Sequence, residues 1–123
     1  MKNDLHFKLT VRLFTDQKCF GPGLAELLHN VQTLKSLRAA AQSMEMAYSK
    51  AWTVIRKSEA ALGFALLQSS TGGKNGGGAV LTAQAEQMLA AYDAYCEELR
   101  QLAGRLFEER FAFYDAPARE AAT

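Results

Sequence analysis

The sequence of 123 residues contains only two cysteines, two histidines and two prolines, and it has no long hydrophobic run. Because Cys19 and Cys96 are far apart, we expect buried or inert thiols rather than a disulfide framework. No apolar run approaches the ~20 residues that cross a bilayer, and the first residues alternate in polarity, unlike a signal peptide. We therefore expect a cytoplasmic protein with no membrane partner.

The patterns that usually indicate catalysis or metal binding are also missing. His6 and His29 have no metal-ligand spacing with each other or with the cysteines, and the sequence contains no CxxC pair. Adjacent acidic residues at 97–98 and 108–109 fall in a predicted helix, where such pairs usually form a solvated face. We expect no enzyme activity, no cofactor and no bound metal.

The sequence also lacks a large excess of charge of one sign. Its 14 basic and 13 acidic residues give a formal net charge of +1, which argues against a nucleic-acid-binding protein held by bulk electrostatics. The charge is unevenly spread, however. Residues 1–81 carry ten Lys and Arg against five Asp and Glu, whereas residues 82–123 carry four against eight. This asymmetry indicates a basic binding region joined to an acidic segment.

The composition that remains, 49% hydrophobic and 22% charged, is typical of a soluble globular protein, and the length suits one domain. Residues 6–14 alternate apolar and polar side chains, which predicts a half-buried strand. Residues 22–31 begin with a proline and then place leucines and a valine at helical spacing. They predict a first amphipathic helix.

Two further helices are predicted, and together they have the pattern of a helix-turn-helix. Ser36 suits the N-cap of a short helix over residues 37–44, and after a break a longer helix covers residues 47–62. The apolar side chains of the longer helix, with Trp52 as an expected core anchor, fall on one side. Its polar and cationic side chains fall on the other side, as they do in a recognition helix.

The segment after these helices predicts a hairpin with a glycine-rich tip. Residues 64–70 and 79–81 read as its two strands, and residues 71–78 between them hold five of the nine glycines, which disfavours regular structure. In this loop Lys74 is followed by Asn75 rather than by Ser or Thr, which argues against a nucleotide-binding P-loop. A helix-turn-helix followed by such a hairpin is a winged helix-turn-helix.

Residues 82–114 contain no proline and predict one long helix with apolar residues at intervals of three and four. Because this length exceeds what the preceding region needs to cover its core, we expect the apolar stripe to pack against a second copy. The expected dimer residues are Met88, Tyr92, Tyr95, Leu99, Leu102 and Leu106. The expected fold is mainly α with a small β component, organised as a winged region (1–81), a dimerisation helix (82–115) and a flexible tail (116–123).

DNA binding requires cations for the phosphates and short polar groups for the base edges, and the outer face of the helix over residues 47–62 offers both. With the preceding helix and the glycine-rich loop, the expected DNA-binding residues are Arg38, Tyr48, Ser49, Lys50, Thr53, Arg56, Lys57, Lys74 and Asn75. Alternatives without DNA binding stay open for these residues. The helix face could simply be solvated, Arg38 could pair with Glu45, and the loop could be only a mobile hairpin.

Five segments, in this order, carry a resemblance to a known family: SLRAAAQSM (36–44), MAYSKAW (46–52), EAALGF (59–64), GGKNGGG (72–78) and LT (81–82). They resemble the N-terminal DNA-binding domain of ModE-type molybdate-responsive regulators and, more distantly, the helix-turn-helix of LysR-type regulators. The resemblance covers roughly residues 20–95. It implies a dimeric, cytoplasmic, bacterial-type transcription factor that places the helix over residues 47–62 in the major groove of double-stranded DNA.

The sequence departs from this family pattern in two places within the turn. The family commonly has glycine where this sequence has Glu45 and serine where it has Ala47. The turn therefore loses a residue that tolerates positive φ, and the recognition helix loses a good N-cap. We expect a strained turn and an altered DNA affinity, with the local fold retained.

The sequence ends at residue 123, where full-length family members continue into molybdate-binding domains, so no effector site is expected in it. Two hypotheses for function follow. The first is a homodimeric transcriptional regulator that binds double-stranded DNA. The alternative is a protein-interaction module on the same scaffold, with weak or no DNA binding.

Overall fold

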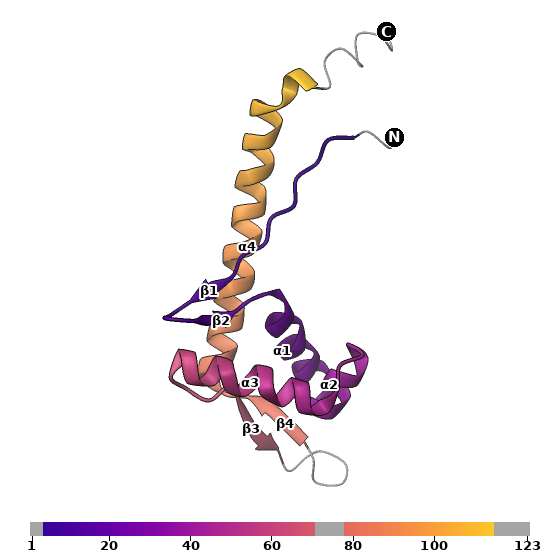
Figure 1. Cartoon of the computed structure of the whole chain (residues 1–123), viewed down its shortest axis with the longest axis vertical. Helices are drawn as coiled ribbons and strands as arrows, with labels where there is room; N and C mark the ends of the chain where they lie inside the picture. The colour runs from indigo at the N-terminus through magenta and orange to yellow at the C-terminus, as the bar shows by residue number, and fades with distance from the viewer. Residues whose placement is uncertain (1–3, 71–77, 115–123) are drawn as a thin grey trace. The chain divides into compact units, whose positions relative to one another are not determined.

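The computed structural model describes residues 4–70 and 78–114. Its elements follow the order β1 (Leu13–Phe14), β2 (Lys18–Phe20), α1 (Pro22–Leu34), α2 (Leu37–Ser43), α3 (Tyr48–Leu62), β3 (Leu67–Ser70), β4 (Gly78–Leu81) and α4 (Ala83–Arg110), as Figure 1 shows. Within these described residues, two antiparallel hairpins accompany four helices, which is the predicted winged helix-turn-helix architecture.

Contacts group the chain into two compact units. One is Val11–Tyr92, and the other joins the residues up to Thr10 with those from Asp93 onward. The predicted boundary near residue 82 falls inside the first unit because the first turns of α4 pack there, with Ala85 and Leu89 buried. That unit therefore contains the whole winged helix-turn-helix and the beginning of the long helix.

The core of the unit Val11–Tyr92 forms around α1. Pro22 occupies the first turn of this helix, and Leu27, Leu28 and Val31 are completely buried, as their helical spacing predicted. Burying a leucine or valine side chain contributes roughly 1.5–3 kcal/mol to folding. These contacts hold α1 against α2 and α3 and so support the element that carries the candidate site.

The turn between α2 and α3 has the geometry that the two family departures predicted. Ser36 caps α2, because its Oγ accepts a hydrogen bond from the Ala39 N–H at 3.1 Å. Glu45 adopts a positive φ of 54°, a left-handed conformation that costs a non-glycine residue roughly 1–2 kcal/mol. Ala47 occupies the N-cap of α3 and makes no side-chain cap bond. The turn forms nonetheless.

The wing is the β3–β4 hairpin, and it is connected to α3 before it and to α4 after it. Gly63 ends α3 at φ 89°, and β3 pairs with β4 from Leu67↔Leu81 to Ser70↔Gly78. Thr82 joins the wing to α4: its hydroxyl donates to the Ala65 carbonyl at 2.7 Å and accepts from the Ala85 N–H at 3.1 Å, which caps the helix. The loop tip, with Lys74 and Asn75, lies outside the described residues.

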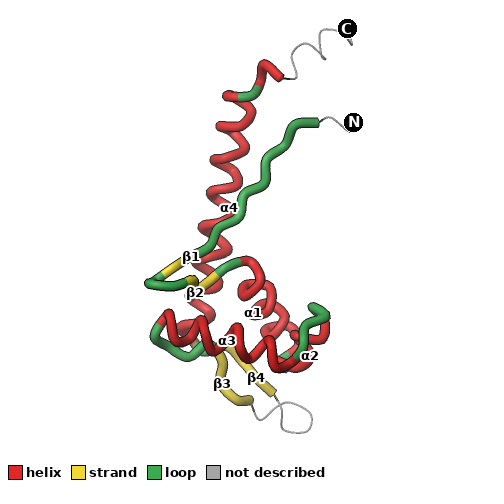
Figure 2. Tube along the Cα trace, viewed as in Figure 1, coloured by secondary structure: helices red, strands yellow, loops and turns green. Residues whose placement is uncertain are grey.

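The predicted strand over residues 6–14 is wrong for most of its length. Only β1 is a strand, and it pairs with β2, which the sequence did not predict. Residues 4–12 form a loop (green in Figure 2), and no strand of the described chain pairs with them. An alternating pattern predicts an extended backbone, but a strand also requires a neighbour to accept and donate its hydrogen bonds.

The second unit consists of segment 4–10 and the part of α4 from Asp93 onward. Segment 4–10 lies along this part of α4 (Figure 2), where the ring centroids of Phe7 and Phe107 are 5.3 Å apart. The helix predicted over residues 82–114 is confirmed, although it ends at Arg110 and only one further turn follows within the described range. Among the residues that the structure describes, no helix has the length and hydropathy of a membrane span. The predicted tail lies outside them.

Candidate nucleic-acid interface

The outer face of α3 is the centre of the candidate site. Ala51 and Ile55 are completely buried and fix the inner face of the helix. The opposite face projects into solvent and carries five of the expected residues, all exposed: Ser49, Lys50, Thr53, Arg56 and Lys57. This face therefore presents hydroxyl groups and cations together on one helix, within reach of a ligand.

Two hydroxyl side chains lie along this face. The Thr53 hydroxyl donates a hydrogen bond to the Ser49 carbonyl at 3.0 Å, within the helix. Its donor is therefore used, and what Thr53 offers outward is its methyl group and an acceptor oxygen. A methyl group at this position suits apolar contact with a thymine methyl in a major groove, whereas the exposed Ser49 hydroxyl can donate or accept.

One flank of the face is a row of arginines held by aromatic rings. The Arg38 guanidinium lies over the Tyr48 ring, with Cζ 4.0 Å from its centroid, and the Arg56 guanidinium lies over the Trp52 ring at 5.0 Å. The two rings meet edge to face at 6.3 Å. Cation–π contact orients each guanidinium and leaves its N–H groups able to bind phosphate oxygens.

This arrangement changes the reading of two aromatic residues. Trp52 was expected to be a core anchor, but it is only half-buried and supports Arg56 at the surface, so that expectation is wrong. Tyr48 is an expected DNA-binding residue, and its ring supports Arg38. Within the described chain, Arg38 forms no ion pair with Glu45, the alternative that the sequence left open.

The other flank of the face borders a groove. It has a volume of about 620 Å³ and lies between α3 and the β1–β2 hairpin, lined by Gln17, Lys18, Ser49, Lys50, Thr53, Val54, Lys57 and Ser58. The helical spacing of polar residues predicted Lys50 and Lys57, but the sequence analysis missed Gln17 and Lys18. Their place beside α3 depends on a strand pairing that no local pattern indicated.

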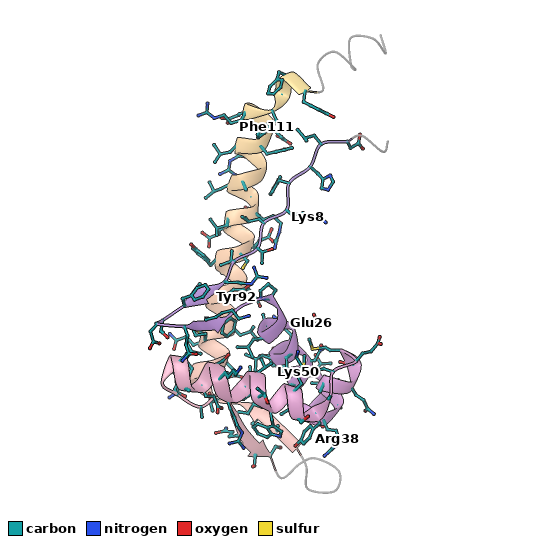
Figure 3. The ribbon with its side chains drawn as sticks, viewed as in Figure 1. Lys8, Glu26, Arg38, Lys50, Tyr92 and Phe111 are labelled. Carbon is teal, nitrogen blue, oxygen red and sulfur yellow. The ribbon has the colours of Figure 1, made fainter. Side chains whose placement is uncertain are left out.

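The expected dimer residues do not all share one environment. Tyr95, Leu102 and Leu106 are 52%, 48% and 55% exposed, and Met88 and Leu99 are partly exposed. The structure corrects the expectation for Tyr92, which is labelled in Figure 3. It is 6% exposed, its hydroxyl donates to the Val11 carbonyl at 2.7 Å, and its ring packs against Phe20 at 4.9 Å. Because these contacts lie within its own chain, Tyr92 belongs to the core and not to a dimer surface.

The helix-turn-helix and wing coincide with a known sequence family. Residues 23–86, more than half of the chain, match the family described as bacterial regulatory helix-turn-helix proteins of the LysR family. The chain belongs to this LysR family. The matched segment covers α1 from its second residue, α2, α3 and the wing, and thus most residues of the candidate interface of this LysR-family protein. The β1–β2 hairpin precedes the matched segment. The distant likeness to LysR-type regulators is confirmed.

Curated relatives confirm the likeness to ModE-type regulators. The chain is 38% identical over 96 residues to transcriptional regulator ModE of Haemophilus influenzae, an alignment that covers 76% of this chain and 36% of that protein. It is 33% identical over 89 residues to the DNA-binding transcriptional dual regulator ModE of Escherichia coli, covering 72% and 32%. The molybdenum-pterin-binding protein MopB of Rhodobacter capsulatus is 37% identical over 68 residues, covering 55% and 25%. The alignments thus span about a third or less of these relatives.

Proposed function

We propose that this protein is a sequence-specific transcriptional regulator that binds double-stranded DNA as a homodimer, with α3 in the major groove. The observation that carries the proposal is the exposed hydroxyl and cationic face of α3 within the helix-turn-helix of a regulatory family. An α-helix with its side chains is about 10–12 Å wide, and the major groove of B-DNA is about 12 Å wide. An exposed helix of this kind therefore fits the groove.

The residues of the face divide by the part of DNA that each would contact. Ser49 and Thr53 lie in the first half of α3, the half of a recognition helix that meets base edges. Arg38 and Arg56 on their aromatic supports suit phosphates, because guanidinium groups bind phosphate oxygens through two N–H donors. Lys50 is placed to reach either a base or a phosphate. The wing, with Lys74 and Asn75, is proposed to follow the backbone or the minor groove.

The homodimer is proposed to form through α4. Tyr95, Leu99, Leu102 and Leu106 follow each other at intervals of four, three and four residues, which is the spacing of a helix-pairing seam. A dimer would present two copies of α3 to half-sites about 34–36 Å apart. Since the formal net charge is only +1, binding by two copies together matters more than non-specific attraction.

The proposal is tested by fluorescence anisotropy with DNA fragments from upstream of the protein's own gene. We expect saturable binding that weakens steeply between about 50 and 200 mM salt, as phosphate contacts require. Lys50→Ala should raise Kd at least about fivefold, the lower limit for losing a base contact of 1 kcal/mol. Lys8→Ala is the matched control: it removes a lysine outside the unit Val11–Tyr92, which we call the winged unit, and it should leave Kd unchanged.

Two results would contradict the proposal. One is the absence of salt-sensitive binding to any upstream fragment by the folded wild-type protein. The other is an unchanged Kd for Lys50→Ala. If DNA binding is absent and the purified protein forms a stable complex with a different protein chain, the interaction module is the better description of this scaffold.

A further inference from the structure

We propose that the β1–β2 hairpin makes an additional contact to the DNA backbone, with Lys18 as its phosphate-binding residue. This inference rests on the proposed function, and it adds a contact from outside the region that defines the family. The hairpin ends at Phe20, whereas the family match begins at residue 23. The contact would thus come in addition to those made by the helix-turn-helix and wing that the family match covers.

The hairpin is built so that Lys18 faces outward from a fixed support. Leu13 pairs with Phe20 and Phe14 pairs with Lys18, so the register shifts by one residue and Cys19 is extra in β2. In a regular strand, successive side chains alternate between faces. Here Cys19 and Phe20 are adjacent and both buried, at 3% and 1% exposure, and Lys18 is exposed. The bulge therefore anchors β2 by two neighbouring side chains and re-aims Lys18.

The turn of the hairpin is fixed by its own hydrogen bonds. The Thr15 N–H donates to the Gln17 carbonyl at 3.0 Å, and the Thr15 hydroxyl donates to Asp16 Oδ1 at 3.2 Å. Below the turn, Phe20 packs against the ring of Tyr92. Lys18 directly follows this turn in β2, whose backbone is held in place. Its side chain therefore loses less conformational entropy on binding than a lysine on a free chain end would.

Lys18 does not stand alone, because it shares the groove with Lys50 and Lys57 of α3. No Asp or Glu is among the described residues that line this groove, and within residues 4–70 and 78–114 none of the three lysines is paired with a carboxylate. Three like charges along one groove, with no carboxylate among its lining residues, create a positive potential that favours a polyanion. The phosphate backbone of DNA is the polyanion that the adjacent α3 face would bring to this groove.

The position of the groove indicates which strand it meets. With 3.6 residues per turn, Lys50 and Lys57 fall on one flank of the exposed face of α3, and the guanidinium supported by Trp52 falls on the other. Ser49 and Thr53 lie between the flanks. A major groove has one phosphate backbone along each side. With α3 in the groove, the hairpin would therefore contact the backbone opposite to the one that Arg38 and Arg56 reach.

The experiment measures Kd against salt concentration for wild type, Lys18→Ala and Lys18→Arg, on an upstream DNA fragment that the wild type binds. Each lysine–phosphate contact contributes about 0.9 to the slope of log Kd against log salt, which amounts to about eightfold in Kd between 1 M and 0.1 M salt. We expect Lys18→Ala to lower the slope by about 0.9 and to raise Kd at 0.1 M salt by about eightfold for each bound subunit, on specific and non-specific DNA alike. Lys18→Arg should keep the contact, and Lys8→Ala should match wild type.

The outcomes separate this inference from the function on which it rests. If Lys50→Ala weakens binding while Lys18→Ala keeps the wild-type slope and Kd, the hairpin contact is wrong and the proposed function stands. If Lys18→Arg loses as much affinity as Lys18→Ala, the effect is structural and the phosphate contact is again wrong. If the wild type shows no salt-sensitive binding, the proposed function fails. Circular dichroism of each variant verifies folding, which an exposed side chain should not affect.

Discussion

At the scale of single residues, the candidate interface depends on side chains that position other side chains. Tyr48 and Trp52 each hold a guanidinium over their rings, so these aromatics contribute to binding through the arginines that they orient. A guanidinium without such support would lose rotamer freedom on meeting a phosphate, at a cost of about 0.5–1.5 kcal/mol for an immobilised long side chain. The rings reduce that cost because the free protein already holds the guanidinium groups in place.

The Arg38–Tyr48 contact can be tested by a double-mutant cycle. Tyr48→Leu removes the ring, and we expect it to weaken DNA binding by about 0.5–1 kcal/mol, or two- to fivefold in Kd. In the Arg38→Ala background the same substitution should have almost no effect, because the group that the ring orients is gone. Tyr48→Phe keeps the ring and is the control for the hydroxyl. Additive losses from Tyr48→Leu and Arg38→Ala would contradict a positioning role, as Kd measurements of the four proteins would show.

At the scale of elements, α3 is presented by a strained turn on one side and by the hairpin on the other. Glu45 holds a left-handed φ of 54° in the turn, and Ala47 leaves the first turn of α3 without a capping side chain. Burial of Ala51 and Ile55 outweighs these local costs and keeps α3 in place. The recognition element is thus supported by packing more than by its own N-terminal signals.

The strain in the turn predicts that Glu45→Gly stabilises the protein. Glycine removes a left-handed penalty of roughly 1–2 kcal/mol. It also raises the entropy of the unfolded chain, which destabilises the folded state by about 0.4–1 kcal/mol. The free energy of unfolding should therefore rise by about 0.5–1 kcal/mol. A gain of this size raises Tm by a few degrees, which thermal unfolding followed by circular dichroism measures. Gln42→Gly, at an exposed position inside α2, is the control and should lower Tm. A lower Tm for Glu45→Gly would show that Glu45 is not strained.

At the scale of the whole molecule, the two ends of α4 have different environments. Its beginning is held in the winged unit, where Ala85, Leu89 and Tyr92 are buried. Further along, Leu102 and Leu106 are about half exposed within the single chain, where hydrophobic side chains at helical spacing would gain free energy by pairing with a second copy. The proposed dimer therefore concerns the later turns of the helix, and the removal of Tyr92 from the interface agrees with this division.

The dimer predicts that Leu102→Asp yields a monomer. Leu102 is 48% exposed in the single chain, so the substitution should leave the protomer folded while placing a charge in the apolar seam. Sedimentation at micromolar concentration should change from dimer to monomer, and affinity for a two-half-site DNA should fall more than affinity for one half-site. Gln101→Glu adds a negative charge on another face of α4 and should remain dimeric. A dimeric Leu102→Asp protein would contradict this interface.

The sequence by itself determined the features that depend on neighbouring residues. Ser36, Gly63 and Thr82 act at helix ends as their residue types predict, and helical spacing identified the apolar and polar faces of α3. Such features require only a few adjacent residues, because capping and periodicity are local.

The tertiary structure decided the features that depend on distant residues. Tyr92 hydrogen-bonds Val11, which is 81 positions earlier, and the β1–β2 pairing brings Lys18 to the side of α3. No local pattern predicts these contacts, because the stability of a strand pair or a buried hydroxyl comes from a partner far along the chain. The recognition helix could therefore be predicted from the sequence. The position of the β1–β2 hairpin beside it and the burial of Tyr92 in the core were decided by the tertiary structure.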